Sequence, residues 1–382
     1  MSSIPFNKPY LHGRELVYIA QAVASGKISG DGIFTQRCQQ FFEQRYGMHR
    51  TLMTTSCTDA LEMCALLLDI GEGDEVIMPS FTFVSSANAF VLRRATLVFA
   101  DSEPGHPNID ASLLEALITP RTRAIVVVHY AGVACDMDPI LALGRRHGVA
   151  IVEDAAHAVD AFYKGRPLGS LGALAAFSFH ETKNVIAGEG GLLAINEPAH
   201  VRRAEIIREK GTNRSAFFRG EVDKYGWVDI GSSFLPSEII SAYLFAQLEN
   251  LAAIQARRQA IWQRYWQLLA PVLPAFGIAL PALPDFASNN GHMFYLVCAS
   301  LAQRDHLIAA LRAAGIHAVF HYQPLHSSPY FRLRHDGRPL PHCDRFSDCL
   351  LRLPLYFELS DAEVDRVVAS LLAALQASAG QP

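Results

Sequence analysis

The feature that most constrains this chain is an alternation of short apolar runs with helix-forming stretches, which extends to about residue 245. Apolar runs without regular polar residues predict strands buried on both faces, as in a parallel sheet covered by helices. The runs lie at residues 75–78, 96–100, 124–129, 149–153, 175–179 and 191–195. This alternation predicts an α/β fold with a large, mostly parallel sheet.

The composition changes near Pro236. From there to residue 269 the chain is rich in Ala, Leu, Gln, Glu and Arg, which predicts one long helix or two stacked helices with Pro236 at the first helical position. Further on, the pattern predicts a strand at 294–298, a helix at 303–314, a strand at 318–322, and a C-terminal helix opened by a capping box of Ser360 and Glu363. We therefore expect a large α/β domain over residues 1–245 and a smaller α+β domain over residues 246–382.

Charge and hydropathy exclude several classes of protein. The formal net charge is −4 and no long run of one sign occurs, so the chain has no electrostatic footprint for nucleic acid. Its N-terminal sequence has no signal-peptide pattern, and no window approaches the ~18 uncharged apolar residues of a membrane helix. We expect a cytoplasmic protein with no nucleic-acid or membrane partner.

The seven cysteines lack CxxC spacing, which argues against a disulfide framework or a zinc site, and we expect no metal. Most of them are interpreted as small core residues. Cys57 is set apart because it lies in a segment of small and hydroxyl residues, 54–60, where Ser56 is placed to cap a helix. The free N–H groups of such a helix start can bind phosphate, although an ordinary cap explains the segment equally well.

Two later segments carry a carboxylate and a lysine. Asp154 ends the apolar strand of segment 150–157, at the sheet edge where ligands bind in α/β proteins. A carboxylate there can keep a pyridinium nitrogen protonated, and a helix cap or surface ion pair is the alternative. Lys183 follows a buried strand and precedes the glycines of segment 188–191. Desolvation would favour its neutral amine, which can form a Schiff base, although a lone lysine in a loop is usually solvated.

In this order, the three segments resemble those of the DegT-type sugar-nucleotide aminotransferases, which are fold-type-I enzymes dependent on pyridoxal phosphate (PLP) and similar in fold to aspartate aminotransferase. The likeness extends to residues 4–9, 71–80, 128–132, 321–326 and 353–356. Segments 80–85, 178–184 and 209–215 resemble those of members that aminate dTDP-4-keto-6-deoxyglucose with glutamate as donor. The resemblance implies the same fold-type-I architecture, PLP as cofactor, and a nucleotide sugar and L-glutamate as substrates. Polysaccharide biosynthesis is the natural hypothesis for the pathway.

The resemblance also assigns roles to residues. Lys183 matches the lysine that carries PLP and then moves the proton between cofactor and sugar. Asp154 matches the carboxylate paired with the pyridinium nitrogen. Phe83 matches an aromatic ring stacked on the cofactor, with an ordinary core phenylalanine as the alternative. Cys57 and Thr58 match the helix-start residues that bind the phosphate.

Three further positions complete the expected cofactor pocket. Ser178 matches a phosphate-binding hydroxyl. The family usually has Gln where this chain has His157, whose imidazole can also donate to the phenolic oxygen of PLP. The family often has Asn, which reaches the phosphate across a subunit interface, where this chain has Ser233, a shorter side chain. Sites shared in this way imply a homodimer or a higher oligomer.

Substrate contacts are implied for five residues. His321, Tyr322 and His326 lie in a segment that family members turn toward the cleft, and Lys210 and Arg214 are candidates for the diphosphate or the donor carboxylates. A solvated or interface role is the alternative for each.

Three alternative functions are known for chains of this general pattern or follow from the resemblance. Deoxygenating relatives have His in place of the lysine, so Lys183 argues against that reaction. A non-catalytic regulator of the same fold is disfavoured because Lys183 and Asp154 are both present. Action on a different nucleotide-linked keto sugar stays open.

Overall fold

The large sheet of the computed structural model, which describes residues 3–379, has seven strands in the order β1-β11-β10-β7-β6-β2-β3. β11 runs antiparallel to both of its neighbours, and the other pairs are parallel. The six strands expected in this part of the sequence all form, and the sequence analysis missed β1. The strands are β1 (Arg50–Thr54), β2 (Glu75–Pro79), β3 (Thr96–Ala100), β6 (Thr122–Val128), β7 (Ala150–Asp154), β10 (Leu174–Ser178) and β11 (Gly191–Ile195).

Both faces of this sheet are buried, which explains why its strands are apolar without alternation. Neighbouring residues of a strand point to opposite faces. In β2, Val76 and Met78 belong to one core cluster and Ile77 to another. α3 packs on the first face, and α2 and α5 pack on the second. The helices of this part are α1 (Glu15–Ala24), α2 (Ile33–Tyr46), α3 (Cys57–Leu67), α4 (Val84–Val91), α5 (Met137–His147), α6 (Val201–Arg208) and α7 (Arg214–Phe218).

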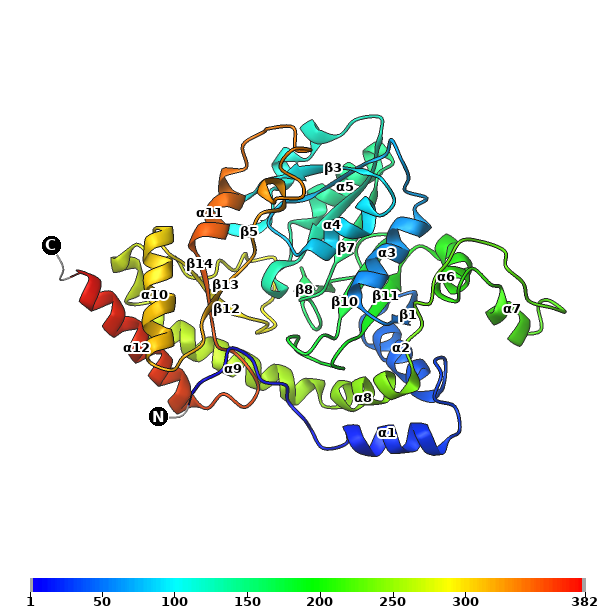
Figure 1. Ribbon diagram of the computed structural model, residues 1–382, viewed down its shortest axis with the longest axis horizontal. Helices are drawn as coiled ribbons and strands as arrows, with labels where there is room; N and C mark the ends of the chain where they lie inside the picture. Colours follow the sequence, from blue (N-terminus) through cyan, green and yellow to red (C-terminus); the bar gives the residue numbers. More distant parts are fainter. Residues whose placement is uncertain (1–2, 380–382) are drawn as a thin grey trace.

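The helical stretch near residue 250 consists of two helices, α8 (Glu238–Glu249) and α9 (Leu251–Leu269), separated at Asn250. The expectation that Pro236 occupies the first helical position is wrong. Ser237 has extended backbone and is the N-cap, so the helix begins at Glu238 and Pro236 lies before it. Figure 1 shows α8 and α9 running along one side of the molecule, with α8 against α1.

A second, antiparallel sheet has the order β12-β14-β13, with β12 (Phe294–Val297), β13 (Val319–Phe320) and β14 (Leu350–Leu353). β13 is shorter than the strand expected at 318–322. Helices α10 (Leu301–Ala313) and α11 (Pro341–Cys349) pack on this sheet, and α12 (Asp361–Ala379) packs on α10 and α9. The capping box is confirmed, since Glu363 N–H donates to Ser360 Oγ (3.3 Å) and Ser360 N–H to Glu363 Oε2 (2.8 Å).

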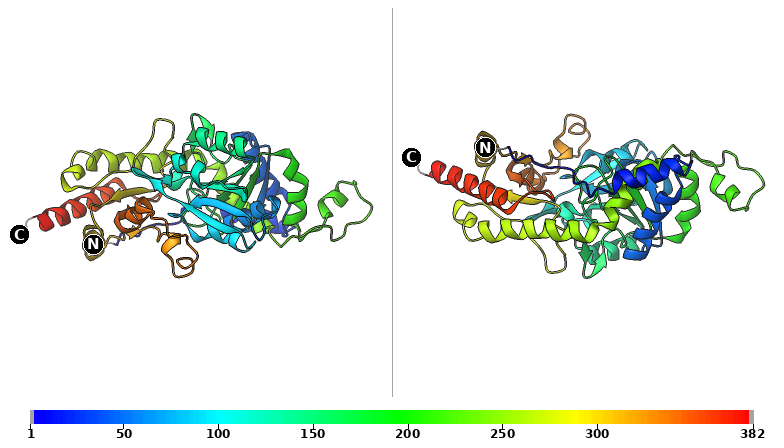
Figure 2. Two further views of the ribbon diagram at one scale, coloured as in Figure 1. Left: turned by 90° about the horizontal axis from the view of Figure 1, so that it is seen from above. Right: turned by 90° about the horizontal axis from the view of Figure 1, so that it is seen from below.

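The remaining strands form two short hairpins, β4 (Ser102–Glu103) with β5 (His106–Ile109) and β8 (Phe162–Tyr163) with β9 (Arg166–Pro167). The segment around α7, residues 210–232, projects from the body at the end opposite α12 in both views of Figure 2. An isolated bridge between Glu209 and Ser233 closes its base. The expected domain boundary between residues 245 and 246 falls within α8, and the division into two domains stays a prediction.

Among residues 3–379, no helix is long and apolar enough to cross a membrane, and no group of three His, Cys, Asp or Glu side chains is arranged to hold a metal. All seven cysteines are unpaired thiols. Six are buried, and Cys57 is half-buried.

The buried Glu238 carboxylate ties α8 to the start of α2. It accepts hydrogen bonds from the backbone N–H groups of Gly32 (3.0 Å), Phe34 (2.8 Å) and Thr35 (3.0 Å) and from the Thr35 hydroxyl. These N–H groups have no acceptor within their own helix, and the helix dipole favours a negative charge there. Glu238 therefore acts as a cap supplied from a distant part of the sequence.

We predict that Glu238→Gln lowers the free energy of unfolding by about 1–3 kcal/mol, because one carboxylate oxygen and the charge are lost from this buried network. Urea unfolding followed by circular dichroism measures the change. Glu72→Gln is the control, since Glu72 is exposed and forms only a surface ion pair with Arg94, and it should change stability by less than about 0.5 kcal/mol. Equal losses in the two variants would contradict the capping role.

Candidate active site

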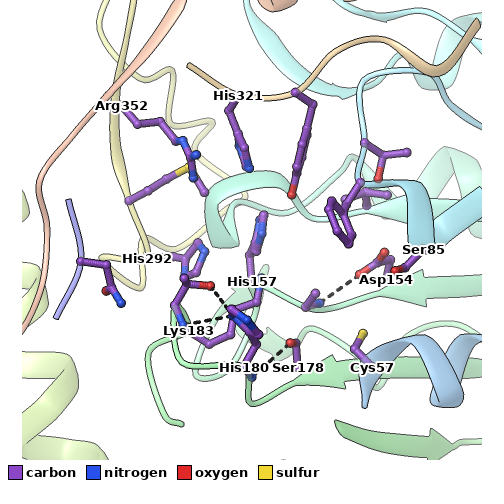
Figure 3. Close-up of a pocket in the computed structure, with 18 of the residues that line it drawn as sticks. Cys57, Ser85, Asp154, His157, Ser178, His180, Lys183, His292, His321 and Arg352 are labelled. Carbon is purple, nitrogen blue, oxygen red and sulfur yellow. Dashed lines mark hydrogen bonds between the residues drawn. The ribbon is translucent and has the colours of Figure 1, made fainter. Parts of the chain in front are cut away.

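A cavity of about 880 Å³ opens at the carboxyl ends of three neighbouring parallel strands. The large sheet contributes Val128 of β6, Asp154 of β7 and Ser178 of β10 to its lining. The second sheet contributes Arg352 of β14. Figure 3 shows Asp154, Ser178 and Arg352 converging from elements that are far apart in the sequence. This edge of an α/β sheet is where ligands bind, because each strand ends there and its loop can contribute a side chain.

The start of α3 forms one end of the cavity. Ser56 is the N-cap, and its hydroxyl accepts a hydrogen bond from Asp59 N–H (3.1 Å). Cys57 and Thr58 follow and line the cavity, as does Ser178. The first N–H groups of a helix have no acceptor within the helix, so this end is suited to a phosphate group. Burial raises the pKa of the Cys57 thiol, so Cys57 offers its backbone N–H beside a neutral side chain.

Gly191 explains how β11 passes so close to this helix start. A Cβ atom at this position would lie 2.3 Å from the carbonyl carbon and oxygen of Ser56 and 2.4 Å from the Cys57 nitrogen. Any side chain would displace the start of α3. The glycine-rich turn noted in the sequence therefore preserves the phosphate end of the cavity.

Asp154 is buried beneath the cavity, where Oδ2 accepts from the Ser86 hydroxyl (2.6 Å) and Oδ1 from Ala156 N–H (3.1 Å). Burial raises the pKa of Asp154, whereas these two donors and the Lys183 charge lower it, and the net effect is a raised pKa. A carboxylate whose ionised form is disfavoured by burial gains strongly from a cation placed against it. A protonated pyridine nitrogen supplies such a cation.

Lys183 lies in the loop between β10 and β11 and lines the cavity. Backbone hydrogen bonds from Lys183 N–H to His180 (2.9 Å) and from Glu181 N–H to Gly188 (3.0 Å) shape the loop. The buried Asn184 anchors it by donating to the Gln255 side chain (2.8 Å). Burial lowers the pKa of Lys183 to about 8, although Cys57 and Asp154 raise it. A substantial fraction of this lysine is therefore a neutral, nucleophilic amine near physiological pH.

His157 is held neutral with a defined tautomer. Its Nδ1 accepts a hydrogen bond from Ala131 N–H (3.3 Å), which leaves the proton on Nε2. Burial and the nearby charges of Lys183 and Arg352 lower its pKa well below the usual value. The His292 ring stacks on it, with centroids 4.3 Å apart. His157 can therefore donate a hydrogen bond to a ligand oxygen without carrying a charge.

Nine of the residues expected from the sequence line this cavity together: Cys57, Thr58, Phe83, Asp154, His157, Ser178, Lys183, His321 and Tyr322. Phe83 is 54% exposed, so it is not an ordinary core residue and its ring is free to cover a flat ligand. His321 receives or donates a hydrogen bond at Nδ1 with the Tyr130 hydroxyl (2.9 Å).

Four expected residues lie elsewhere. His326 links the end of β2 to helix α11, with Nδ1 2.7 Å from Ser80 Oγ and Nε2 3.4 Å from Asp344 Oδ1. Lys210, Arg214 and Ser233 are exposed on or beside the projecting segment around α7, and none lines the cavity of its own chain. The roles given to these four residues stay predictions.

Several residues that line or support the cavity were not predicted from the sequence, among them Ser86, His292 and Arg352. Ser86 supports Asp154 from α4, and 68 residues separate the two, so no local pattern joins them. His292 precedes β12 in a segment without a recognisable motif. Arg352 does have a signal in the sequence, since it is a charged residue inside the otherwise apolar strand LLRL.

The arrangement fits PLP group by group. The start of α3 with Ser178 suits the phosphate, Asp154 suits the pyridine nitrogen, His157 suits the phenolic oxygen, and the Lys183 amine suits the aldehyde. The raised pKa of Asp154 and the lowered pKa of Lys183 both indicate a site whose charges are completed by a ligand.

Comparisons with known proteins agree with this geometry. A family model described as the DegT/DnrJ/EryC1/StrS aminotransferase family matches residues 9–372. The structure is similar to that of the aminotransferase TlmJ from Streptoalloteichus hindustanus, with a TM-score of 0.90, 31% identity, and 99% of this chain and 100% of that chain covered. It is also similar to DesV from S. venezuelae (TM-score 0.89, 32% identity, 98% and 99% covered) and to the PMP form of the putative sugar aminotransferase Spr1654 from Streptococcus pneumoniae (0.90, 26%, 98% and 98%).

We predict that Asp154→Asn retains most of its PLP but lowers turnover per bound PLP roughly 10- to 100-fold, the loss expected for one hydrogen bond to a charged group. Absorbance gives the PLP content, and steady-state kinetics give the turnover. Asp101→Asn is the matched control, because Asp101 is equally buried but caps α11 away from the cavity. Turnover in Asp154→Asn close to that of the control would remove Asp154 from its role.

Proposed function

This chain belongs to the DegT/DnrJ/EryC1/StrS aminotransferase family, and from that premise we propose that it converts dTDP-4-keto-6-deoxy-D-glucose to dTDP-4-amino-4,6-dideoxygalactose with L-glutamate as amino donor. Membership confirms the fold-type-I class, the aminotransferase activity and PLP as cofactor. The observation that carries the proposal is Lys183 in one cavity with Asp154 and the start of α3. The choice of this sugar is supported by the likeness of segments 80–85, 178–184 and 209–215 described above.

PLP, when bound, withdraws electrons from the carbon next to the reacting nitrogen and so makes a proton on that carbon removable. In this chain the N–H groups of Cys57 and Thr58 with the Ser178 hydroxyl would hold the phosphate. Asp154, oriented by Ser86 and Ala156, would keep the ring nitrogen protonated. Phe83 would cover one face of the ring.

Lys183 has the second task of moving a proton. With a pKa near 8, its Nζ can accept the proton from the α-carbon of glutamate and release it again within one turnover. In the second half of the reaction, the same amine would deliver a proton to C4 of the sugar. Glutamate leaves as 2-oxoglutarate, and the sugar ketone is replaced by an amine on a carbon that carries one new hydrogen.

The projecting segment around α7 supports a homodimer. Its apolar side chains are exposed in a single chain, with Phe218 at 69% and Trp227 at 83%, and contiguous exposed apolar surface marks an interface. Figure 1 shows the segment extending from the body with nothing packed against its outer side. In a homodimer this segment would bring Lys210, Arg214 and Ser233 to the cavity of the second copy, where a phosphate or a carboxylate would meet them.

The proposal is tested by the absorbance spectrum of the purified protein with PLP. Glutamate should convert the band of bound PLP to that of the pyridoxamine form, and dTDP-4-keto-6-deoxyglucose should restore it. Lys183→Ala should fold normally but show neither conversion above background, because the nucleophile and the proton carrier are lost.

The outcomes separate the parts of the proposal. If glutamate changes the band and this sugar does not restore it while another nucleotide-linked keto sugar does, the substrate assignment is wrong and the aminotransferase stands. If glutamate leaves the band unchanged, the donor assignment fails. If the protein binds no PLP, the interpretation of Lys183 and its cavity fails, and a non-catalytic member of the family becomes the better account.

A further inference from the structure

Arg352 is a cation in the cavity wall with few partners of its own. Its Nη2 donates to the carbonyl oxygen of Phe320 (3.1 Å), and its guanidinium carbon lies 4.7 Å from the centre of the Phe6 ring. Its Nε atom is buried and has no hydrogen-bond partner. No carboxylate among residues 3–379 forms an ion pair with it, and burial lowers its pKa. Arg352 is half-buried, and a guanidinium that has a buried Nε atom without an acceptor and no anion beside it is left incomplete.

Arg258 shows that this is not a general property of arginines at the cavity. It also lines the cavity and has no carboxylate partner, but its side chain is committed to the backbone. Its Nε donates to Gly291 (3.1 Å), and its Nη2 donates to the carbonyl oxygens of His292 (2.7 Å) and Leu355 (3.5 Å). Arg258 therefore has a structural task, whereas most donors of Arg352 remain available to a ligand.

Within residues 3–379, the groups that Arg352 acts on electrostatically include a lysine and three histidines. Its charge acts on Lys183, His157, His292 and His321, and it lowers the pKa of each of them. Figure 3 shows Arg352 on the same side of the cavity as Lys183 and His292, with Asp154 on the opposite side. Glu189, the second carboxylate that lines the cavity, lies beside His180 (Nε2 to Oε1, 3.7 Å), so the groups around Arg352 itself are cationic or neutral, which favours a bound anion.

We propose that Arg352 binds a carboxylate of the amino donor, and so also of the 2-oxo acid that the donor becomes. The inference rests on the proposed function. One carboxylate of the donor is bonded to the carbon that must approach Lys183. The diphosphate of the sugar nucleotide is attached at C1 of the sugar, across the ring from the reacting C4, so it lies farther from Lys183. The planar guanidinium also matches a carboxylate in a bidentate pair.

The test is isothermal titration calorimetry of the PLP-loaded protein with 2-oxoglutarate, which binds this form without reacting because it has no amino group. Arg352→Gln should raise the dissociation constant about 30-fold or more, as expected when one partner of a buried charge pair is removed. Arg352→Lys keeps the positive charge but loses the two parallel N–H donors of the guanidinium, so its dissociation constant for 2-oxoglutarate should lie between those of the parent protein and Arg352→Gln. Titration with dTDP should give the same affinity, within about threefold, in all three proteins.

Arg304→Gln is the matched control. Arg304 also donates to one backbone carbonyl, that of Ser347 (2.7 Å), and lies over an aromatic ring, that of Phe320 (5.6 Å). Unlike Arg352, it pairs with a carboxylate, Asp305 (2.8 Å), and it does not line the cavity. Its substitution should leave 2-oxoglutarate binding unchanged. The PLP band and the thermal unfolding midpoint of each variant show that fold and cofactor are retained. If Arg352→Gln does not fold, the test rests on Arg352→Lys, which should bind 2-oxoglutarate about tenfold more weakly than the parent protein.

Three results would overturn the proposal, and they differ from one another. Unchanged 2-oxoglutarate affinity in the folded Arg352 variants removes the residue from donor binding. Loss of dTDP affinity with intact 2-oxoglutarate affinity assigns Arg352 to the diphosphate instead. If the parent protein itself binds no 2-oxoglutarate, the proposed donor is wrong, and this failure is recognised before any substitution is made.

Discussion

Two consecutive carboxylates at the end of β7 form the constraint on which the site depends. Because neighbouring residues of a strand point to opposite faces, Glu153 and Asp154 are directed apart. Glu153 accepts from the backbone N–H groups of Gly169 (2.7 Å), Leu171 (2.7 Å) and Gly172 (2.6 Å) and pairs with His129 (2.9 Å). This buried network fixes the loop that leads into β10, and therefore the strand from whose end Ser178 and Lys183 reach the cavity. Asp154 points to the other face, where it lines the cavity and is available to a ligand.

The cavity is electrically divided as a result. Asp154 and its hydroxyl partner Ser86 lie on one side, and Lys183 and Arg352 lie on the other. Burial disfavours the charged form of each group, raising the pKa of Asp154 and lowering those of Lys183 and Arg352. A cofactor with a cationic ring nitrogen would stabilise the charged form of Asp154, and a substrate with an acidic group would stabilise the charged form of Arg352.

The parts of this structure that the sequence predicts are those set by local pattern. Strands such as β2 and β7 are buried on both faces, and the cap at Ser56 and the capping box at Ser360 are determined within four residues. The support of Asp154 by Ser86 and the position of Arg352 beside Lys183 depend on how distant elements pack, and no local spacing records that. β13 is shorter than expected because only Val319 and Phe320 pair with β14, and His321 and Tyr322, which also line the cavity, have no strand partner.

The central claim is that Lys183 carries the cofactor in this cavity, and mass spectrometry tests it most directly. The PLP-loaded protein is reduced with borohydride, digested and mapped, so that the lysine joined to PLP keeps the phosphopyridoxyl group. The account predicts this group on the peptide that contains Lys183 and its absence when excess glutamate is added before reduction. The group on a different lysine, or on none, would contradict the account.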